Sequence, residues 1–193
     1  GEERDVLAQD LTPMVWDPVQ IEALDRAAVA AGLASVPVHL KLDTGMGRLG
    51  ATSEDLPDVL KALARVSRLH LEGVASHLAS SDVLDAIQND EQSASFDRML
   101  KVVLDAGFSP RYLHMANSAA LLSRPTSWKN MVRPGIAMYG YALNFRRAGR
   151  VEENQSPIPM VPALSWKTRI LLIKQVPANQ SLGYNATFTT KAP

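Results

Sequence analysis

Short apolar runs alternate with amphipathic stretches over the first three quarters of the chain. Runs that read as strands occur at 13–16, 38–43, 69–77 and 112–115, and 131–139 closes the series. Apolar residues at helical spacing between these runs predict helices, at 17–32, from about 53, at 86–106 and, for a short helix, after 118. Repeated strand–helix units predict an α/β fold with a parallel sheet.

Local signals support the helix boundaries. Asp17 suits an N-cap, with Pro18 in the first turn, and Gly32 ends that segment. The second helix has a polar start at Ser53, and the long one stops at Gly107. These residues therefore mark where helices begin and end.

The pattern of strands and helices alone leaves an open doubly wound sheet and a barrel as alternatives for the sheet type. No Gly-x-Gly-x-x-Gly follows a strand, so a dinucleotide-binding fold lacks support. Polar side chains fall where strands end, as in a barrel with its site at one rim: Asp43, His77, Asn117 and Arg133. About five strand–helix units are present, against eight in a closed barrel. We expect a partial (β/α)8 TIM-type barrel.

The pattern of residue types along the chain changes after Tyr141. Residues 144–159 are polar and contain prolines, which is typical of a linker or exposed loop. Beyond them, 164–173 and 181–188 read as strands without helices. We expect a cofactor-binding partial barrel over 1–155 and the beginning of a β-rich domain over 156–193.

Composition excludes several classes of function. Of 193 residues, 46% are hydrophobic and 21% charged, and the formal net charge is zero, so no charge excess recruits nucleic acid or an anionic membrane. No membrane span or signal peptide is visible. The absence of cysteine removes disulfides and thiolate chemistry and fits a cytoplasmic protein. No pair of histidines shows metal-ligand spacing.

The stretch from Val38 to Gly50 concentrates candidate chemistry. Apolar positions alternate with polar ones up to Asp43, which predicts a strand with two different faces. The turn Thr44–Gly47 then brings Arg48 back toward Lys41. Such a turn either forms part of a site or exposes its charges to water.

The segment Lys-Leu-Asp-Thr-Gly-Met-Gly-Arg-Leu-Gly at 41–50 resembles a signature of alanine racemase, a pyridoxal-phosphate enzyme that interconverts L- and D-alanine. Four more segments resemble that family, at 72–82, 114–120, 132–140 and 181–188. The resemblance implies pyridoxal 5'-phosphate as cofactor, alanine as substrate and a role in supplying D-alanine for peptidoglycan. A racemase of another amino acid on the same barrel is the alternative.

The resemblance assigns a phosphate-binding role to the segments around Asn117 and Gly135. Asn117 and Ser118 follow a strand and open a helix, where free N–H groups favour an anion. Gly135 and Ile136 match backbone N–H donors to the same phosphate, and a glycine lets an anion approach. An ordinary helix cap is the other reading of Asn117 and Ser118.

The resemblance also assigns catalytic roles. Arg133 matches an arginine that faces the pyridine nitrogen and, staying protonated, keeps that nitrogen unprotonated. His77 matches the histidine linking Arg133 to the catalytic tyrosine, which Tyr184 matches. Arg48 matches a contact of the cofactor's phenolic oxygen, and Lys41 a lysine that is carbamylated in many relatives. The remaining histidines match no functional position: His39, His70 and His114.

In the family the tyrosine acts on a cofactor held by the other subunit, which implies a head-to-tail homodimer with shared sites. The family's Schiff-base lysine has no match in this sequence. We therefore expect a fragment that lacks the first barrel strands and is inactive alone. A non-catalytic remnant that binds a phosphate is a further alternative.

Overall fold

The computed structural model describes residues 2–141, 143–152 and 158–192, in two units, 1–162 and 163–193. The expected domain boundary at 155/156 lies in 153–157, outside the described residues.

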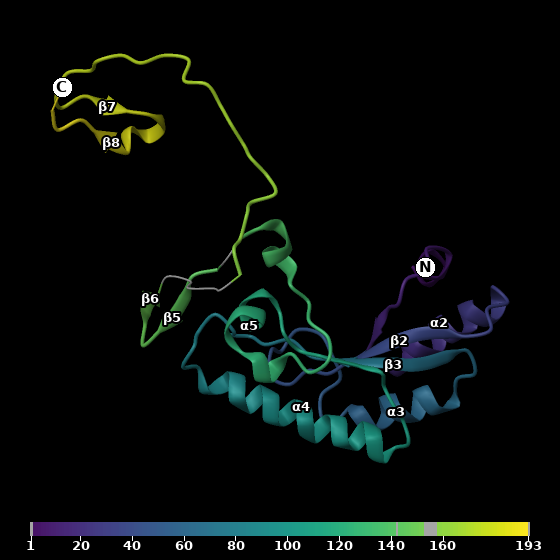
Figure 1. Cartoon of the computed structure of the whole chain (residues 1–193). Coiled ribbons are helices and arrows are strands. Elements are labelled where there is room, and N and C mark those ends of the chain that lie inside the picture. The colour runs from purple at the N-terminus through teal and green to yellow at the C-terminus, as the bar shows by residue number, and fades with distance from the viewer. Residues whose placement is uncertain (1, 142, 153–157, 193) are drawn as a thin grey trace. The chain divides into compact units, whose positions relative to one another are not determined.

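A parallel four-stranded sheet, in the order β1-β2-β3-β4, forms the centre of the first unit. Its strands are β1 Met14–Val15, β2 Val36–Lys41, β3 Leu69–Ala75 and β4 Tyr112–His114. Each strand is followed by a helix: α2 Pro18–Ala30, α3 Leu56–Arg65, α4 Ile87–Asp105 and α5 Ser118–Ser123. Figure 1 shows α3 and α4 along one side of β2 and β3. Parallel strands place their carboxyl ends at one edge, so residues that follow β2, β3 and β4 meet there.

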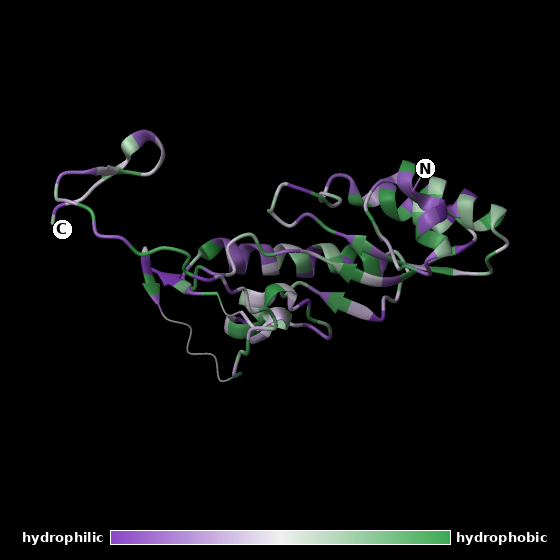
Figure 2. Cartoon of the chain, turned by 90° about the horizontal axis from the view of Figure 1, so that it is seen from above, coloured by the Kyte–Doolittle hydropathy of each residue, from purple (hydrophilic) through white to green (hydrophobic). Residues whose placement is uncertain are grey.

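The helices α2 to α5 form where the sequence predicts them, whereas α1 Glu3–Ala8 was not predicted. Asp17 caps α2 by accepting hydrogen bonds from the N–H groups of Val19 and Gln20, and Pro18 opens the helix. Each of α2 to α5 presents an apolar face to one continuous core, with Ile21, Leu60 and Phe96 among its buried members. Figure 2 shows hydrophobic residues interleaved with hydrophilic ones along these elements.

Four strand–helix units are seen in the sheet, rather than about five. The fifth segment, 131–139, forms no strand in the described structure; it contains η2 Gly135–Tyr139, a 3-10 helix. Pro134 lacks an N–H for sheet pairing, and Gly135 has φ +43, so the backbone turns instead of extending. The remaining elements of the first unit are α1 Glu3–Ala8, η1 Pro125–Ser127, β5 Phe145–Arg147 and β6 Arg150–Glu152. Strands β5 and β6 pair antiparallel within 144–159, which the sequence predicted to be a linker or exposed loop, so that prediction was wrong for these residues.

The second unit contains less strand than the sequence suggests. Its elements are β7 Ser181–Leu182, η3 Tyr184–Ala186 and β8 Phe188–Thr189. The apolar run 164–173 has no strand pairing, and its large side chains are exposed. A strand needs a neighbour for its backbone groups, and within the described residues this run has none.

The two faces of β2 are not simply apolar and polar. Val38, Leu40 and Leu42 are fully buried, as predicted. His39 is also buried, at 8% exposure, although it lies on the polar side of the alternation. Buried polar groups require partners, so His39 indicates an internal polar cluster. No helix within the described residues is long and apolar enough to cross a membrane.

Candidate active site

A cavity of about 510 Å³ lies at the carboxyl ends of β3 and β4. Six residues predicted from sequence line it: His77, Asn117, Ser118, Arg133, Gly135 and Ile136. They come from the β3 exit, the first turn of α5 and the segment that leads into η2. The structure therefore brings together most of the candidate site, from positions far apart in sequence.

Ser118 and Gly135 form one wall of the cavity. The Asn117 side chain caps α5, accepting from the Ala120 N–H at 3.1 Å and from the Ser81 hydroxyl at 2.8 Å. The Ser118 hydroxyl donates to the Pro134 carbonyl and accepts from the Ala137 N–H. A Cβ at Gly135 would lie 3.2 Å from Ser118 Oγ, so the glycine keeps this wall open. Gly135 and Ile136 begin η2, where the first N–H groups lack helical partners.

Arg133 is the polar centre of the cavity. Its guanidinium donates to Nδ1 of His114, and Nη2 lies 2.6 Å from the Ser76 carbonyl oxygen and 3.4 Å from that of Met115. Nη2 is also 3.4 Å from Nδ1 of His77. All these partners are uncharged acceptors, and none of the described ion pairs involves Arg133. The cation therefore keeps its full charge toward the cavity.

Arg133 also fixes the proton positions of its two histidines. A guanidinium only donates, so Nδ1 of both His77 and His114 must accept. Each neutral ring then holds its proton on Nε2. His77 accordingly offers an Nε2–H donor on the side away from Arg133.

His39 extends the same polar cluster into the sheet. Nε2 of His114 lies 2.8 Å from Nδ1 of His39, and His39 Nε2 lies 3.8 Å from a Glu72 carboxylate oxygen. Because His114 donates from Nε2, His39 accepts at Nδ1 and directs its own proton to Glu72. The cluster runs Arg133–His114–His39–Glu72, with every donor direction set by the arginine.

Sequence reasoning missed His39 and His114, which it left without a role. The available signal was Gly73, which pairs with His39 across the β2–β3 ladder. A glycine inside a strand marks a place where another group approaches closely. Recognising it required the register of two strands, which the pattern of either strand does not contain.

Burial and the nearby cation keep these rings neutral. Burial, and then the charge of Arg133, lower the pKa of His114 to about 3. The same two causes, in the same order, lower the pKa of His77. Burial also lowers the pKa of His39, against the opposing pull of Glu72. Neutral rings are what the hydrogen-bond directions require.

The turn after β2 is closed by Asp43. One oxygen of its carboxylate accepts from the N–H groups of Gly45, Met46 and Gly47 at 2.9–3.1 Å. Burial alone would raise the pKa of Asp43, but these donors and Lys41 hold it below its usual value. The carboxylate thus serves the turn rather than the cavity.

Lys41 and Arg48 lie near each other, as the turn predicts, but do not bond to one another among the described contacts. Burial, followed by the charge of Arg133, lowers the pKa of Lys41 to about 8, and Arg48 adds to this effect. Lys41 Nζ donates to the Leu42 carbonyl at 3.1 Å. Arg48 is exposed and does not line the cavity.

Tyr184 belongs to the second unit, so its position relative to the cavity is not described. Its side chain is 97% exposed within the structure. The catalytic role of Tyr184 stays a prediction.

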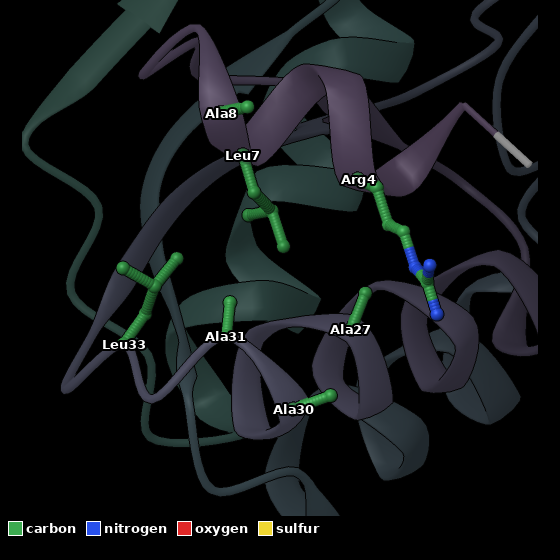
Figure 3. Close-up of a pocket in the computed structure, with 7 residues that line it drawn as sticks. All are labelled: Arg4, Leu7, Ala8, Ala27, Ala30, Ala31 and Leu33. Atoms are coloured by element: carbon green, nitrogen blue, oxygen red, sulfur yellow. The ribbon is translucent and has the colours of Figure 1, made fainter.

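A second hollow, of about 410 Å³, lies between α1 and α2 (Figure 3). Its lining is alanine and leucine, with Arg4 as the one charged residue among those lining it. It has no combination of groups for chemistry, so the cavity around Arg133 is the candidate site.

The fold and the site together define a class: a parallel α/β domain with a cationic cavity at the carboxyl ends of its strands. The family model for the alanine racemase N-terminal domain matches residues 1–143. The chain therefore belongs to the alanine racemase N-terminal domain family, and the predicted family and α/β partial-barrel fold are confirmed.

Individual alanine racemases are also similar to this chain in sequence and in structure. The chain is 37% identical to the alanine racemase of Desulfosudis oleivorans, over 98% of this chain and 49% of that protein. Among solved structures, alanine racemase from Streptomyces coelicolor A3(2) has a TM-score of 0.86 and 30% identity, covering 100% of this chain and 50% of that one. Alanine racemase from Bartonella henselae with covalently bound pyridoxal phosphate shares the fold at 23% identity and TM-score 0.74, over 100% of this chain and 49% of that one. The chain spans about half the length of the curated relatives it matches.

Proposed function

We propose that this chain forms part of a pyridoxal-phosphate-dependent isomerase that interconverts L-alanine and D-alanine, acts in the cytoplasm and supplies D-alanine for cell-wall peptidoglycan. The observation that supports it most is Arg133, a cation surrounded by neutral acceptors at the edge of a cavity. A charge without a carboxylate partner fits a site that receives an acceptor group from a ligand. Because the chain spans about half of its relatives, the activity is proposed for the complete gene product.

The cavity residues fit the phosphate end of the cofactor. Ser118 offers a hydroxyl, and Gly135 and Ile136 offer N–H groups at the start of η2. Gly135 has no side chain to fill the space beside Ser118. These groups would hold a phosphate at the wall of the cavity, with Asn117 fixing the first turn of α5.

Arg133 would face the pyridine nitrogen of the cofactor. When bound, pyridoxal phosphate supplies an electron sink for the charge that develops at the α-carbon of the amino acid. Arg133 would donate to the pyridine nitrogen and leave it without a proton, since a guanidinium has no acceptor. Its partners Ser76 and His114 hold the guanidinium in one orientation.

Tyr184 is the base we propose for one face of the α-carbon. A tyrosine has a reference pKa near 10, so it needs a donor to stabilise its phenolate at neutral pH. His77 has an Nε2–H free to point that way, because Arg133 occupies its Nδ1. We propose that Tyr184 of the partner subunit receives this hydrogen bond in a head-to-tail homodimer.

Lys41 and Arg48 complete the proposed site. The lowered pKa of Lys41 leaves part of its amine neutral and reactive near pH 7 to 8. Carbamylation would turn this cation into an anion and replace its repulsion of Arg48 by attraction. Arg48 would then be held toward the phenolic oxygen of the cofactor.

The test uses the complete gene product mixed with pyridoxal phosphate. Its visible spectrum is recorded before and after borohydride, and the conversion of L-alanine to D-alanine is followed beside that of serine and lysine. We expect a cofactor band that borohydride fixes to the protein, with alanine turned over fastest.

Two results would overturn the proposal. The absence of a fixed band would show that the cofactor is not covalently held. A fixed band with a different preferred amino acid would keep the cofactor but replace the substrate.

A further inference from the structure

We propose that Gln92 is a positioning residue that holds His77 and Arg133 in their working orientation from behind the cavity. Gln92 lies in α4, is 1% exposed and does not line the cavity. The inference deepens the proposed function and rests on it for the roles of His77 and Arg133.

The side-chain amide of Gln92 forms two hydrogen bonds to the loop that carries His77. Its Nε2 donates to the His77 carbonyl at 2.9 Å, and its Oε1 accepts from the Ala79 N–H at 2.9 Å. These two bonds clamp the backbone on both sides of Leu78. The backbone of His77 is therefore fixed by a side chain from another element.

The second Nε2 hydrogen of Gln92 reaches the turn after β2. It donates to the Thr44 hydroxyl at 3.4 Å, so the Thr44 proton must go elsewhere. Thr44 Oγ1 lies 2.7 Å from Ser76 Oγ, which lies 3.0 Å from the Leu42 carbonyl oxygen. The only consistent direction is Gln92 to Thr44 to Ser76 to Leu42, which satisfies all three buried side chains.

The series of hydrogen bonds that starts at Gln92 ends near Arg133, because Ser76 takes part in both. The Ser76 hydroxyl is held by the hydrogen bonds that lead from Gln92 through Thr44. The backbone carbonyl of Ser76 accepts from Arg133 at 2.6 Å. The carbonyl of the next residue, His77, accepts from Gln92. Arg133 and Gln92 thus hold two successive carbonyls at the β3 exit, so a shift at Gln92 displaces the acceptors of Arg133.

A matched control exists one turn earlier on the same helix. Gln88 contacts the same two loops, accepting from the Ser80 hydroxyl at 2.7 Å and donating to the Gly45 carbonyl at 3.3 Å. Gln88 is exposed and has no contact with His77 among the described bonds. A general loosening of α4 or its loops would affect both glutamines, whereas positioning of His77 belongs to Gln92.

The experiment compares Gln92→Met, Thr44→Val and Gln88→Met in the complete gene product without added cofactor. Methionine keeps the length of glutamine, and valine keeps the shape of threonine while removing its hydroxyl. The readouts are hydrogen exchange at the Ala79 amide and the imidazole ¹⁵N spectrum of His77. Gln92→Met is expected to speed Ala79 exchange about tenfold or more and to alter the His77 tautomer signals, with a smaller change in the same direction for Thr44→Val.

A second readout uses alanine turnover by the same variants after pyridoxal phosphate is added. Gln92→Met is expected to lower kcat about 10- to 100-fold with a smaller change in KM, since a misplaced site loses rate more than binding. Gln88→Met is expected to match the unsubstituted protein in every readout. If Gln92→Met fails to fold, Thr44→Val alone must still change the His77 spectrum.

Three results would overturn the inference: an unchanged His77 spectrum in both variants, an equal change in Gln88→Met, or a loss of stability with kcat unchanged. Failure of the proposed function looks different. In that case the unsubstituted protein shows no alanine turnover, while the variants still change the His77 spectrum.

Discussion

Gly73 pairs with His39 across the β2–β3 ladder, and a Cβ at position 73 would lie 2.8 Å from three atoms of the His39 ring. No ordinary Cβ contact is that short, so the missing side chain is what admits the imidazole. The same ring links Glu72 to His114. A glycine in a strand therefore makes space for the polar cluster behind Arg133.

Gly73→Ala is expected to destabilise the protein by about 1–3 kcal/mol, because the added methyl pushes His39 away from His114. Urea unfolding of the complete gene product measures the change. The control is the same substitution in a His39→Ala background, where the ring is gone and the cost should nearly vanish. An equal cost in both backgrounds would mean that Gly73 matters for another reason.

Arg133→Glu is expected to slow alanine racemisation by about 100-fold or more, since a carboxylate would favour protonation of the pyridine nitrogen and accept a hydrogen bond from it, whereas the guanidinium keeps that nitrogen unprotonated. The glutamate would also place an acceptor beside the carbonyl oxygens of Ser76 and Met115, which would repel it. Arg133→Lys keeps the charge and should lose less activity. Single-turnover kinetics with L-alanine measure both variants, and an unchanged rate for Arg133→Glu contradicts the role assigned to Arg133.

The stability of the protein is expected to fall as pH drops below about 6.5, the ordinary pKa of histidine. The pKa of His114 is lowered to about 3 in the fold, so the unfolded chain takes up the proton first. The contribution is therefore complete above pH 6.5 and is lost toward pH 3, amounting to about 2 kcal/mol between pH 7 and pH 5. Urea titrations at each pH measure it.

His114→Gln separates this effect from general acid unfolding. The variant lacks the titrating ring and should show a shallower loss of stability over the same range. Equal slopes for the two proteins would assign the pH dependence to other groups.

Lys41 is expected to form a carbamate when the protein is equilibrated with ¹³C-labelled bicarbonate, because its lowered pKa leaves a reactive amine. A carbamate resonance in the ¹³C spectrum that disappears in Lys41→Gln is the measurement. Lys61, exposed and paired with Asp58 at 2.7 Å, serves as the control. A signal that survives in Lys41→Gln but not in Lys61→Gln would contradict the assignment.

The helices α2 to α5 and the strands β1 to β4 could be predicted because their signals are local, whereas α1 and the β5–β6 pair were not predicted. Asp17 caps its own helix, and Leu60 faces the core through spacing along one segment. Most of the cavity was predictable too, because Arg133 and Ser118 stand in short segments that resemble a family signature.

The polar cluster could not be predicted, because it depends on relations between strands. His39 reads as a polar-face residue within β2, and only the register with β3 and β4 shows its neighbours. The prediction of a strand at 164–173 was wrong for a related reason. Its apolar alternation predicts a strand, but a strand also requires a pairing partner, and the described residues supply none.

Ser118 has a single hydroxyl proton, and here it goes to the Pro134 carbonyl. A phosphate at this wall would compete for the same proton, so its arrival exchanges one acceptor for another. The Ser118–Pro134 hydrogen bond consequently joins the first turn of α5 to the residue that precedes η2. The wall of the cavity is therefore already formed before a ligand binds. A phosphate has only to replace the Pro134 carbonyl as the acceptor of the Ser118 proton.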